Sequence, residues 1–279
     1  MPGSASPAEI WEQSVDLAVT DPVGPARRRL PLYEAGAVEV PFVIRDNTEV
    51  IERDTHWEEH SHPTHELLWN ARGTSTATVG DRVWTVTPNN GLWIPAGVRH
   101  SGWTPAGTWQ RAALFGIDSV PSISERPAAV EVTVLLRLLL DRLSEDGLDD
   151  TSRATTEATI LDILAPAPHE ILLRVPHSPL LAVIAERLRK DPSDTTSLAE
   201  WAERSGVSTR TITRAFEAET GLGFSRWTAT ARAQHAMLRL SAGDSIDEVA
   251  ASVGYRSSTA FGTAFRRVTG VSPGRFRSL

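Results

Sequence analysis

The chain has 279 residues, which is long enough for two domains with separate hydrophobic cores. Its composition, 41% hydrophobic and 23% charged, is typical of a globular protein. It contains no cysteine, which excludes disulfides and thiolate metal sites. No apolar run reaches the ~20 residues that a membrane-spanning helix needs, and the segment from Met1 to Val19 is acidic and unlike a signal peptide. We therefore expect a cytoplasmic protein that does not engage a membrane.

The net charge of −7 is unevenly distributed along the chain. Residues 1–179 hold 14 Arg against 25 Asp and Glu, a net charge of −11. Residues 180–279 hold 14 Arg and Lys against 10 Asp and Glu, a net charge of +4. A basic C-terminal part on an acidic remainder is compatible with contacts to DNA phosphates.

Short β-strands are expected between about Val38 and Ile117. Runs such as 76–79, 82–86 and 91–94 are rich in strand-forming residues and are separated by Gly, Asp, Asn and Pro. Gly80-Asp81 is a hairpin turn signal. Close, regular strand spacing predicts a small barrel or sandwich, which we assign to residues 1–127 together with an N-terminal extension.

A helical segment is expected over residues 128–164. The apolar residues Val132, Leu135, Leu136, Leu139 and Leu143 follow helical spacing, and a second helix is expected from about Thr155 to Leu164. This Leu-rich face could pack on the barrel or on a second copy of the chain. We favour a homodimer held by Leu135, Leu136 and Leu139, because further apolar residues (Val134, Leu138, Leu140) widen the face. Proline-rich residues 165–179 then predict a linker.

Residues 180–279 are expected to form a helical C-terminal domain, and the last eighty residues contain an internal repeat. Leu198, Glu200, Ala202 and Gly206 recur as Ile246, Glu248, Ala250 and Gly254, and Ile212, Ala215, Phe216, Thr220 and Gly221 recur as Phe261, Ala264, Phe265, Thr269 and Gly270. Each copy predicts a helix, a tight turn at glycine and a second helix, with Ser208 capping the second helix of the first copy. The segment 225–240 between them is expected to form one connecting helix. The pattern indicates two helix-turn-helix units, whose outward faces suit the major groove of DNA.

The repeat resembles the DNA-binding domain of the AraC/XylS family of transcription regulators. The resemblance is carried by residues 208–216 and Glu219-Thr220-Gly221 in the first unit, and by Val253-Gly254-Tyr255, Ala260-Phe261, residues 264–267 and residues 270–273 in the second. It implies an α+β chain that binds promoter DNA as a sequence-specific regulator, with RNA polymerase as a further partner. The implied DNA-contacting residues are Ser208, Arg210, Thr211, Thr213 and Arg214 in the first unit, and Ser258, Thr259, Gly262, Thr263, Arg266 and Arg267 in the second. Many members carry Arg where Thr263 stands, so the second unit is expected to contribute mainly phosphate contacts.

Five of the eight histidines lie within residues 56–100. The spacing His60-x-His62-x-x-x-Glu66 followed by Gly73 resembles the first motif of the cupin barrel, and residues 95–100 resemble the second. The resemblance implies a divalent transition metal (Zn, Ni, Mn or Fe) held by His60, His62, Glu66 and His100. The chain departs from the motif at Gly91, which is displaced, and at Thr104, which replaces an Asn. His65, next to Glu66, leaves the ligand set open, and a hydrogen-bonded histidine patch without metal is the alternative.

An effector pocket is expected in the same barrel, lined by His65, Trp69, Trp84 and Trp93, although core packing is the commoner role of any one Trp. Three hypotheses remain open at this point. The first is a regulator that senses a metal or a small molecule, the second is a cupin-type metalloenzyme fused to a DNA-binding tail, and the third is a barrel that only dimerises the DNA-binding units. The first is favoured, because an attached DNA-binding domain provides an output for sensing and none for catalysis.

Overall fold

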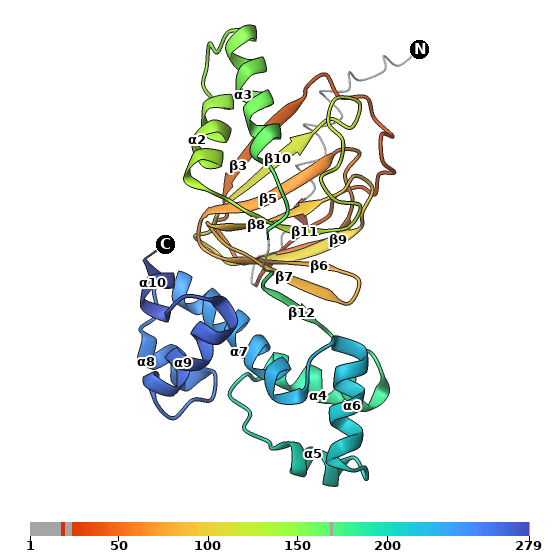
Figure 1. Cartoon of the computed structure of the whole chain (residues 1–279), viewed down its shortest axis with the longest axis vertical. Coiled ribbons are helices and arrows are strands. Elements are labelled where there is room, and N and C mark those ends of the chain that lie inside the picture. The colour runs from red at the N-terminus through yellow and green to blue at the C-terminus, as the bar shows by residue number, and fades with distance from the viewer. Residues whose placement is uncertain (1–17, 20–23, 168–169, 279) are drawn as a thin grey trace. The chain divides into compact units, whose positions relative to one another are not determined.

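The structure, a computed structural model, describes residues 18–19, 24–167 and 170–278. It divides into two compact units (Figure 1). The first unit takes residues 1–79 and 86–170, and the second takes residues 80–85 and 171–279. The predicted class, a β-rich N-terminal part followed by an α-helical C-terminal part, is confirmed. Most of the segment Met1–Val19 lies outside the described residues.

Strands dominate the first unit. In chain order the strands of the described residues are β1 (Ala18–Val19), β2 (Ala26–Arg28), β3 (Ile44–Val50), β4 (Thr55–His60), β5 (His65–Arg72), β6 (Ser75–Val79), β7 (Arg82–Val86), β8 (Asn90–Ile94), β9 (His100–Thr104), β10 (Trp109–Phe115), β11 (Ala128–Glu131) and β12 (Leu172–Arg174). Of these, β12 and all of β7 except Val86 belong to the second unit. One sheet contains the order β1-β2-β4-β9-β6, and the other has the order β11-β8-β5-β10-β3. The strands thus form two sheets, and Gly80-Asp81 forms the expected turn between β6 and β7.

Helices follow. They are α2 (Val134–Leu143), α3 (Asp150–Ile163), α4 (Pro179–Lys190), α5 (Leu198–Arg204), α6 (Thr209–Thr220), α7 (Phe224–Ser241), α8 (Ile246–Ser252), α9 (Ser258–Thr269) and α10 (Pro273–Arg277). The expected helical segment therefore begins at Val134, because Ala128–Glu131 pairs with β8 as a strand. The expected linker 165–179 includes a further strand, β12, which pairs with β7.

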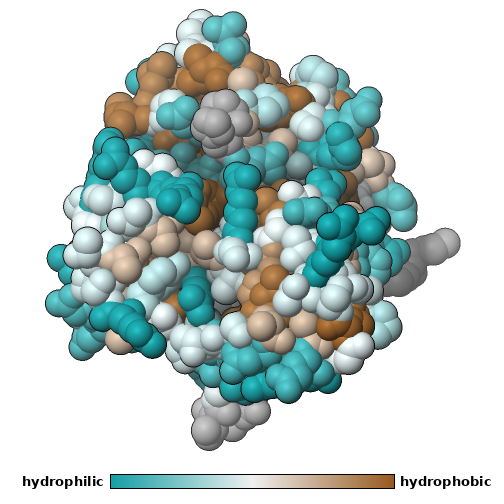
Figure 2. All heavy atoms as spheres, turned by 60° about the horizontal axis from the view of Figure 1, so that its bottom comes forward, coloured by the Kyte–Doolittle hydropathy of each residue, from teal (hydrophilic) through white to brown (hydrophobic). Residues whose placement is uncertain are grey.

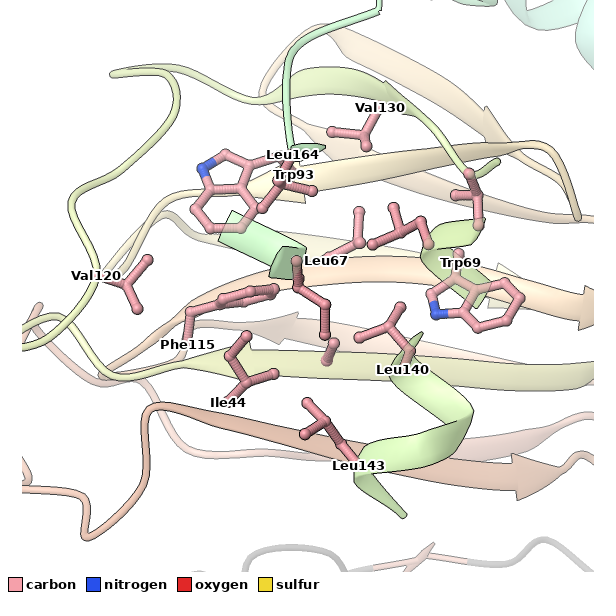
Figure 3. Packing of buried hydrophobic residues seen from close by; sticks show 14 residues of the cluster. Ile44, Leu67, Trp69, Trp93, Phe115, Val120, Val130, Leu140, Leu143 and Leu164 are labelled. Atoms are coloured by element: carbon pink, nitrogen blue, oxygen red, sulfur yellow. The ribbon is translucent and has the colours of Figure 1, made fainter. Parts of the chain in front are cut away.

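The five-stranded sheet is buried on the face that α2 and α3 cover. Leu67, Trp69 and Phe115 from its strands form one hydrophobic core with Leu136 and Leu140 of α2 (Figure 3). This corrects the expected dimer face: Leu136 is 2% exposed and Leu139 packs against the same core. The helix buries these side chains on its own unit because the sheet offers a continuous apolar surface.

A buried ion network ties α2 to the edge of that sheet. Arg111 of β10 bonds to Asp46 of β3, and its Nη1 donates to Asp141 of α2 at 2.7 Å. The guanidinium also lies over the ring of Trp69, 5.1 Å from the ring centroid. Burial raises the pKa of Asp46 even though the hydrogen bond and charge of Arg111 act in the opposite direction. Since buried charges need partners, these side chains hold one another in place.

The second unit contains both copies of the repeat. The leading helices α5 and α8 each begin with a capping box, Ser197 with Glu200 and Ser245 with Glu248. The connecting helix α7 lies between α4–α6 and α8–α10, as the sequence predicts (Figure 1). Within the same unit, Gln234 of α7 donates to the carbonyl of Val83 at 3.0 Å.

Candidate functional site

The histidine cluster assembles at the neighbouring ends of β4 and β9. His60 ends β4 and His100 begins β9, and the two are directly opposite in the antiparallel register. Their ring centroids are therefore only 4.2 Å apart. The ring of His62, just beyond the end of β4, lies 5.1 Å from that of His60 and 5.3 Å from that of His100.

Gly97 holds the loop that positions His62. Its N–H donates to the carbonyl of His62 at 2.8 Å. Gly97 has a φ of +74°, and a Cβ there would lie 2.9 Å from the backbone nitrogen of Ala35. Only glycine meets both conditions without strain, so the second motif supports the first through its backbone.

Glu66 faces the imidazoles from β5. Its Oε2 lies 3.4 Å from Nε2 of both His62 and His100, and the residue is 5% exposed. Among the described residues this oxygen has no partner with good hydrogen-bond geometry. A buried carboxylate oxygen in this position is well placed to face a cation.

The orientation of two rings is set by backbone carbonyls. Nδ1 of His60 lies 2.7 Å from the carbonyl oxygen of Glu58, and Nδ1 of His100 lies 3.0 Å from that of Val98. Because a carbonyl only accepts, each Nδ1 carries the proton in the neutral ring and each Nε2 keeps its lone pair. Such contacts orient histidines that bind metals through the other nitrogen.

Burial and mutual charge shift the pKa values of the cluster. Burial, reinforced by the nearby His100 and His62, lowers the pKa of His60 to about 3. Burial would raise the pKa of Glu66, but the nearby His62 and His100 outweigh it and lower the pKa to about 2. Burial opposes protonation of His100, yet the neighbouring carboxylate of Glu66 raises its pKa. The cluster thus contains an ionised carboxylate and at least one neutral imidazole.

The four residues implied by the cupin resemblance come together. Ligand nitrogens of His60, His62 and His100 lie within 4.8 Å of one another. Three imidazoles and a carboxylate are a donor set that Zn, Ni, Mn or Fe accepts. His65 does not join them, because it lies on the opposite face of β5 from Glu66. Its Nδ1 accepts the N–H of Ala96 at 2.9 Å.

A cavity of about 380 Å³ adjoins the cluster. Its lining includes all four cluster residues. The other lining residues are mainly apolar or neutral, and they include Trp57, Leu68, Thr104, Gln110, Ala112 and Leu114. Trp57 Nε1 donates to the hydroxyl of Thr104 at 3.0 Å, and that hydroxyl donates to Oε1 of Gln110 at 3.0 Å. Thr104, which replaces the usual Asn of the motif, thereby orients a polar side chain of the wall.

The expected pocket residues do not line this cavity, and that prediction is corrected. Trp69 and Trp93 lie in the core under α2 and α3, where the ring centroid of His65 is 5.3 Å from that of Trp93 (Figure 3). Trp84 is 1% exposed on β7 and pairs in register with Leu172. Trp57 is the tryptophan in the lining, and it was missed. Strand alternation could have predicted the lining. Glu66 and Leu68 point to the cavity face of β5, whereas Leu67 and Trp69 point to the opposite, core face.

The first helix-turn-helix unit is built as its sequence predicts. Ser208 caps α6, accepting the N–H of Thr211 at 3.1 Å, and Gly206 takes a φ of +64° in the turn. Ile212 and Phe216 are buried, which leaves Arg210 and Arg214 exposed. Thr211 is exposed as well, whereas the half-buried Thr213 bonds its hydroxyl to the carbonyl of Thr209.

The second unit repeats this arrangement. Ser257 caps α9, Gly254 takes a φ of +78°, and Phe261 and Phe265 are buried. Thr259, Thr263, Arg266 and Arg267 are exposed, and Gly262 is half-buried. Ser258 is half-buried and its hydroxyl donates to Asp247 of α8, so it braces the two helices of the unit.

Matched hydrogen bonds explain the Thr-Gly pair that ends both α6 and α9. Thr220 donates to the carbonyl of Phe216 and accepts the N–H of Leu222, and Thr269 does the same with Phe265 and Val271. Gly221 and Gly270 follow in the left-handed conformation.

Four guanidinium groups are available on the outward faces. Arg210, Arg214, Arg266 and Arg267 have no hydrogen-bond or ion-pair partner among the residues that the structure describes. Figure 2 shows one side of the molecule, on which hydrophilic residues are spread widely and hydrophobic ones gather in several groups. Unpaired Arg side chains on a helix suit bonds to guanine or to phosphate.

Two family models match the chain. A helix-turn-helix domain matches residues 201–278, and an AraC-like ligand-binding domain matches residues 48–159. The HTH-type transcriptional regulator NimR of Escherichia coli is 30% identical over 221 residues, which cover 78% of this chain and 81% of NimR. The chain belongs to the AraC family. It is a DNA-binding transcription regulator with a ligand-binding domain, and its relatives are regulators rather than enzymes.

Other relatives match in part. The HTH-type transcriptional regulator RipA of Corynebacterium diphtheriae is 29% identical over 213 residues, covering 76% of this chain and 60% of RipA. The DNA-binding domain of AdpA, solved with a target DNA, is 35% identical and covers 37% of this chain and 92% of that one, with a TM-score of 0.34. Among the described residues, no helix of this AraC-family chain combines the length and apolarity needed to cross a membrane.

The histidine cluster predicts a pH dependence of stability. The unfolded His60 has a pKa of 6.5, whereas the folded residue stays neutral to about pH 3. The folded state therefore binds fewer protons, and the free energy of unfolding falls as the pH drops below 6.5. In metal-free protein, we expect the free energy of unfolding of the wild type to fall by about 2 kcal/mol more than that of His60→Gln between pH 7.5 and pH 5.

Urea unfolding at a series of pH values measures this difference. The lowered pKa of His62 has the same effect on the pH dependence of stability as that of His60, and the raised pKa of His100 has the opposite effect. Both residues are present in the wild type and in the variant. Parallel pH profiles for the two proteins would contradict the prediction.

Proposed function

We propose that this AraC-family regulator senses a divalent transition metal bound by His60, His62, Glu66 and His100, together with a small organic effector in the adjoining cavity. The observation that carries the proposal is the buried cluster itself, in which three imidazole nitrogens lie within 4.8 Å and Oε2 of Glu66 lies 3.4 Å from two of them. We further propose that occupancy of this site controls promoter binding by α6 and α9.

The protein's own residues are prepared for a cation. The carbonyls of Glu58 and Val98 hold the Nδ1 protons of His60 and His100, so that each Nε2 is directed to the centre. Glu66, with its pKa near 2, supplies a negative charge at neutral pH. A bound metal would supply a positive charge beside the cavity.

The cavity is suited to a compact organic molecule. An engineered cavity of about 150 Å³ holds a benzene ring, so a volume of about 380 Å³ accommodates a larger ring system. Apolar walls with few oriented polar groups, such as the amide of Gln110, are typical of small-molecule sites.

The division of labour on DNA follows from the exposed side chains. Arg210 and Arg214 lie four residues apart on α6 and are suited to reading guanines. On α9, Gly262 has no side chain and Ser258 is engaged with Asp247, which leaves Arg266 and Arg267 for phosphates. RNA polymerase as a partner and a cytoplasmic location, where promoter DNA lies, are part of the same proposal.

Metal analysis tests the sensor. Protein purified without a metal-affinity tag is expected to contain about one equivalent of one transition metal, and His62→Ala is expected to lose it because one of four ligands is gone. Elemental analysis by mass spectrometry measures the content. His56→Ala is the matched control, since His56 is exposed on β4, the strand that precedes His62. Absence of metal from wild type, even after loading with Zn, Ni, Mn and Fe, would refute the metal site.

Arg214→Ala tests base reading by α6. We expect it to weaken binding to the preferred operator by about 1–3 kcal/mol, with a smaller loss on random DNA, because a bidentate bond to guanine is sequence-specific. Fluorescence anisotropy with both duplexes measures the two affinities. Arg189→Ala, an exposed arginine of α4, is the control for charge alone. Equal losses on both duplexes would mean that Arg214 contacts phosphate.

We propose a homodimer through the apolar residues that α2 leaves exposed. Val134, Leu135 and Leu138 are 65%, 53% and 61% exposed. We expect a dimer at micromolar concentration in sedimentation velocity, and a monomer for Leu135→Glu/Leu138→Glu, because two charges would enter the apolar contact. A wild-type monomer at this concentration would contradict the dimer.

A further inference from the structure

The connecting helix α7 belongs to two separate hydrophobic cores. Its first half contributes Phe224, Trp227 and Ala231 to the core with α4, α5 and α6. Its second half contributes residues such as Ala233 and Met237 to the core with α8, α9 and α10. The change from one core to the other falls between positions 231 and 233, where the residue is Arg232.

Arg232 contacts both halves of the DNA-binding unit. Its Nε donates to the carbonyl of Pro192 at 3.0 Å and its Nη2 donates to the carbonyl of Asp194 at 2.8 Å, both in the loop between α4 and α5. On its other side the guanidinium lies over the ring of Tyr255, 5.5 Å from the centroid, in the turn between α8 and α9. One side chain thus joins the two helix-turn-helix units.

The loop that Arg232 holds is itself ordered. The carboxylate of Asp194 accepts from Nε of Arg187 at 2.7 Å and from the N–H of Thr196 at 2.7 Å. These bonds lower the pKa of Asp194 to about 2 despite the opposing effect of burial. Arg232 therefore bonds to a loop of the first helix-turn-helix half that is held by its own hydrogen bonds and that leads directly into α5.

The turn of the second unit fits against the same loop. Gly254 has a φ of +78°, and a Cβ there would lie 2.9 Å from the carbonyl oxygen of Ser193 and 3.1 Å from Nη2 of Arg232. The turn glycine thus serves the helix-turn-helix geometry and also allows close packing between the two units.

We propose that Arg232 is a positioning residue that sets the orientation of α6 relative to α9 and, through it, the spacing between half-sites that the regulator accepts. The inference rests on the proposed use of both helices on one duplex. Successive base pairs are rotated by about 34–36° around the helix axis, so a helix pair held rigidly accepts one spacing, whereas a loosened pair accepts neighbouring ones.

The experiment uses the full chain and a duplex selected by it from a random-sequence library. Affinities are measured for this duplex, for a version with one base pair inserted between the half-sites, for versions with either half-site scrambled, and for random DNA. Arg232→Met removes the hydrogen bonds to Pro192 and Asp194 and keeps an unbranched side chain. Arg226→Met removes the same charge from an exposed position of the same helix and is the matched control.

For wild type and Arg226→Met we expect the insertion to weaken binding about tenfold or more, comparable to a poor match in the site. For Arg232→Met we expect this insertion penalty to shrink to about threefold or less, with weaker binding to the original duplex. If Arg232→Met loses its helical circular dichroism signal, Arg232→Lys and Tyr255→Leu are measured in the same way, and both are expected to reduce the penalty.

Two results would overturn the inference. The first is that the folded Arg232 or Tyr255 variants lose as much affinity on insertion of one base pair as the wild type does. The second is an equal loss of affinity on selected and random duplexes, which would make Arg232 a phosphate contact. If the two reading helices do not bind one duplex together, the wild type keeps its affinity when one half-site is scrambled. That result would refute the proposed use of both helices, and the inference about Arg232 would be wrong as well.

Discussion

The first unit depends on one constraint: successive side chains of a strand point to opposite faces, and the five-stranded sheet is buried on both. On β5, Leu67 and Trp69 pack under α2 and α3, whereas Glu66 and Leu68 line the cavity. On β10, Gln110, Ala112 and Leu114 line the cavity, and the residues between them face the core or its ion network. A slip of one residue in β5 would bury Glu66 in the apolar core and expose Trp69 to the cavity.

This alternation marks how far the sequence could predict the site. Motif spacing identified all four cluster residues, because a short separation along the chain and a strand pairing bring them together. It did not identify the lining, since tryptophans were chosen by residue type without their phase relative to Glu66. Counting in twos from Glu66 would have assigned His65 and Trp69 to the opposite face. The helix α2 was harder, because an apolar helix face looks the same whether it packs on its own sheet or on another copy.

The DNA-binding unit could be predicted in more detail because its determinants are local and occur twice. Caps, turn glycines and Thr-Gly ends lie within a few residues of the backbone groups that they satisfy. Arg232 has no such local signal. Its partners are the carbonyls of Pro192 and Asp194, about forty positions earlier, and any residue type offers a carbonyl. The sequence pattern therefore predicts each helix-turn-helix unit but not the contact that relates one to the other.

The buried ion network gives the cavity wall a further property. Arg111 stands between Gln110 and Ala112, two residues that meet the cavity, and on the reverse face it bonds to Asp46 and Asp141. Loss of Asp46 would cost about 3–5 kcal/mol, because the buried charge of Arg111 would be left uncompensated. Asp141 is 54% exposed, so its pair with Arg111 contributes less. The strand that faces the cavity thus cannot shift relative to α2 without disturbing this network. Because α2 also carries the exposed residues Val134, Leu135 and Leu138, the cavity and this apolar surface are linked through β10 and the hydrogen bond from Arg111 to Asp141.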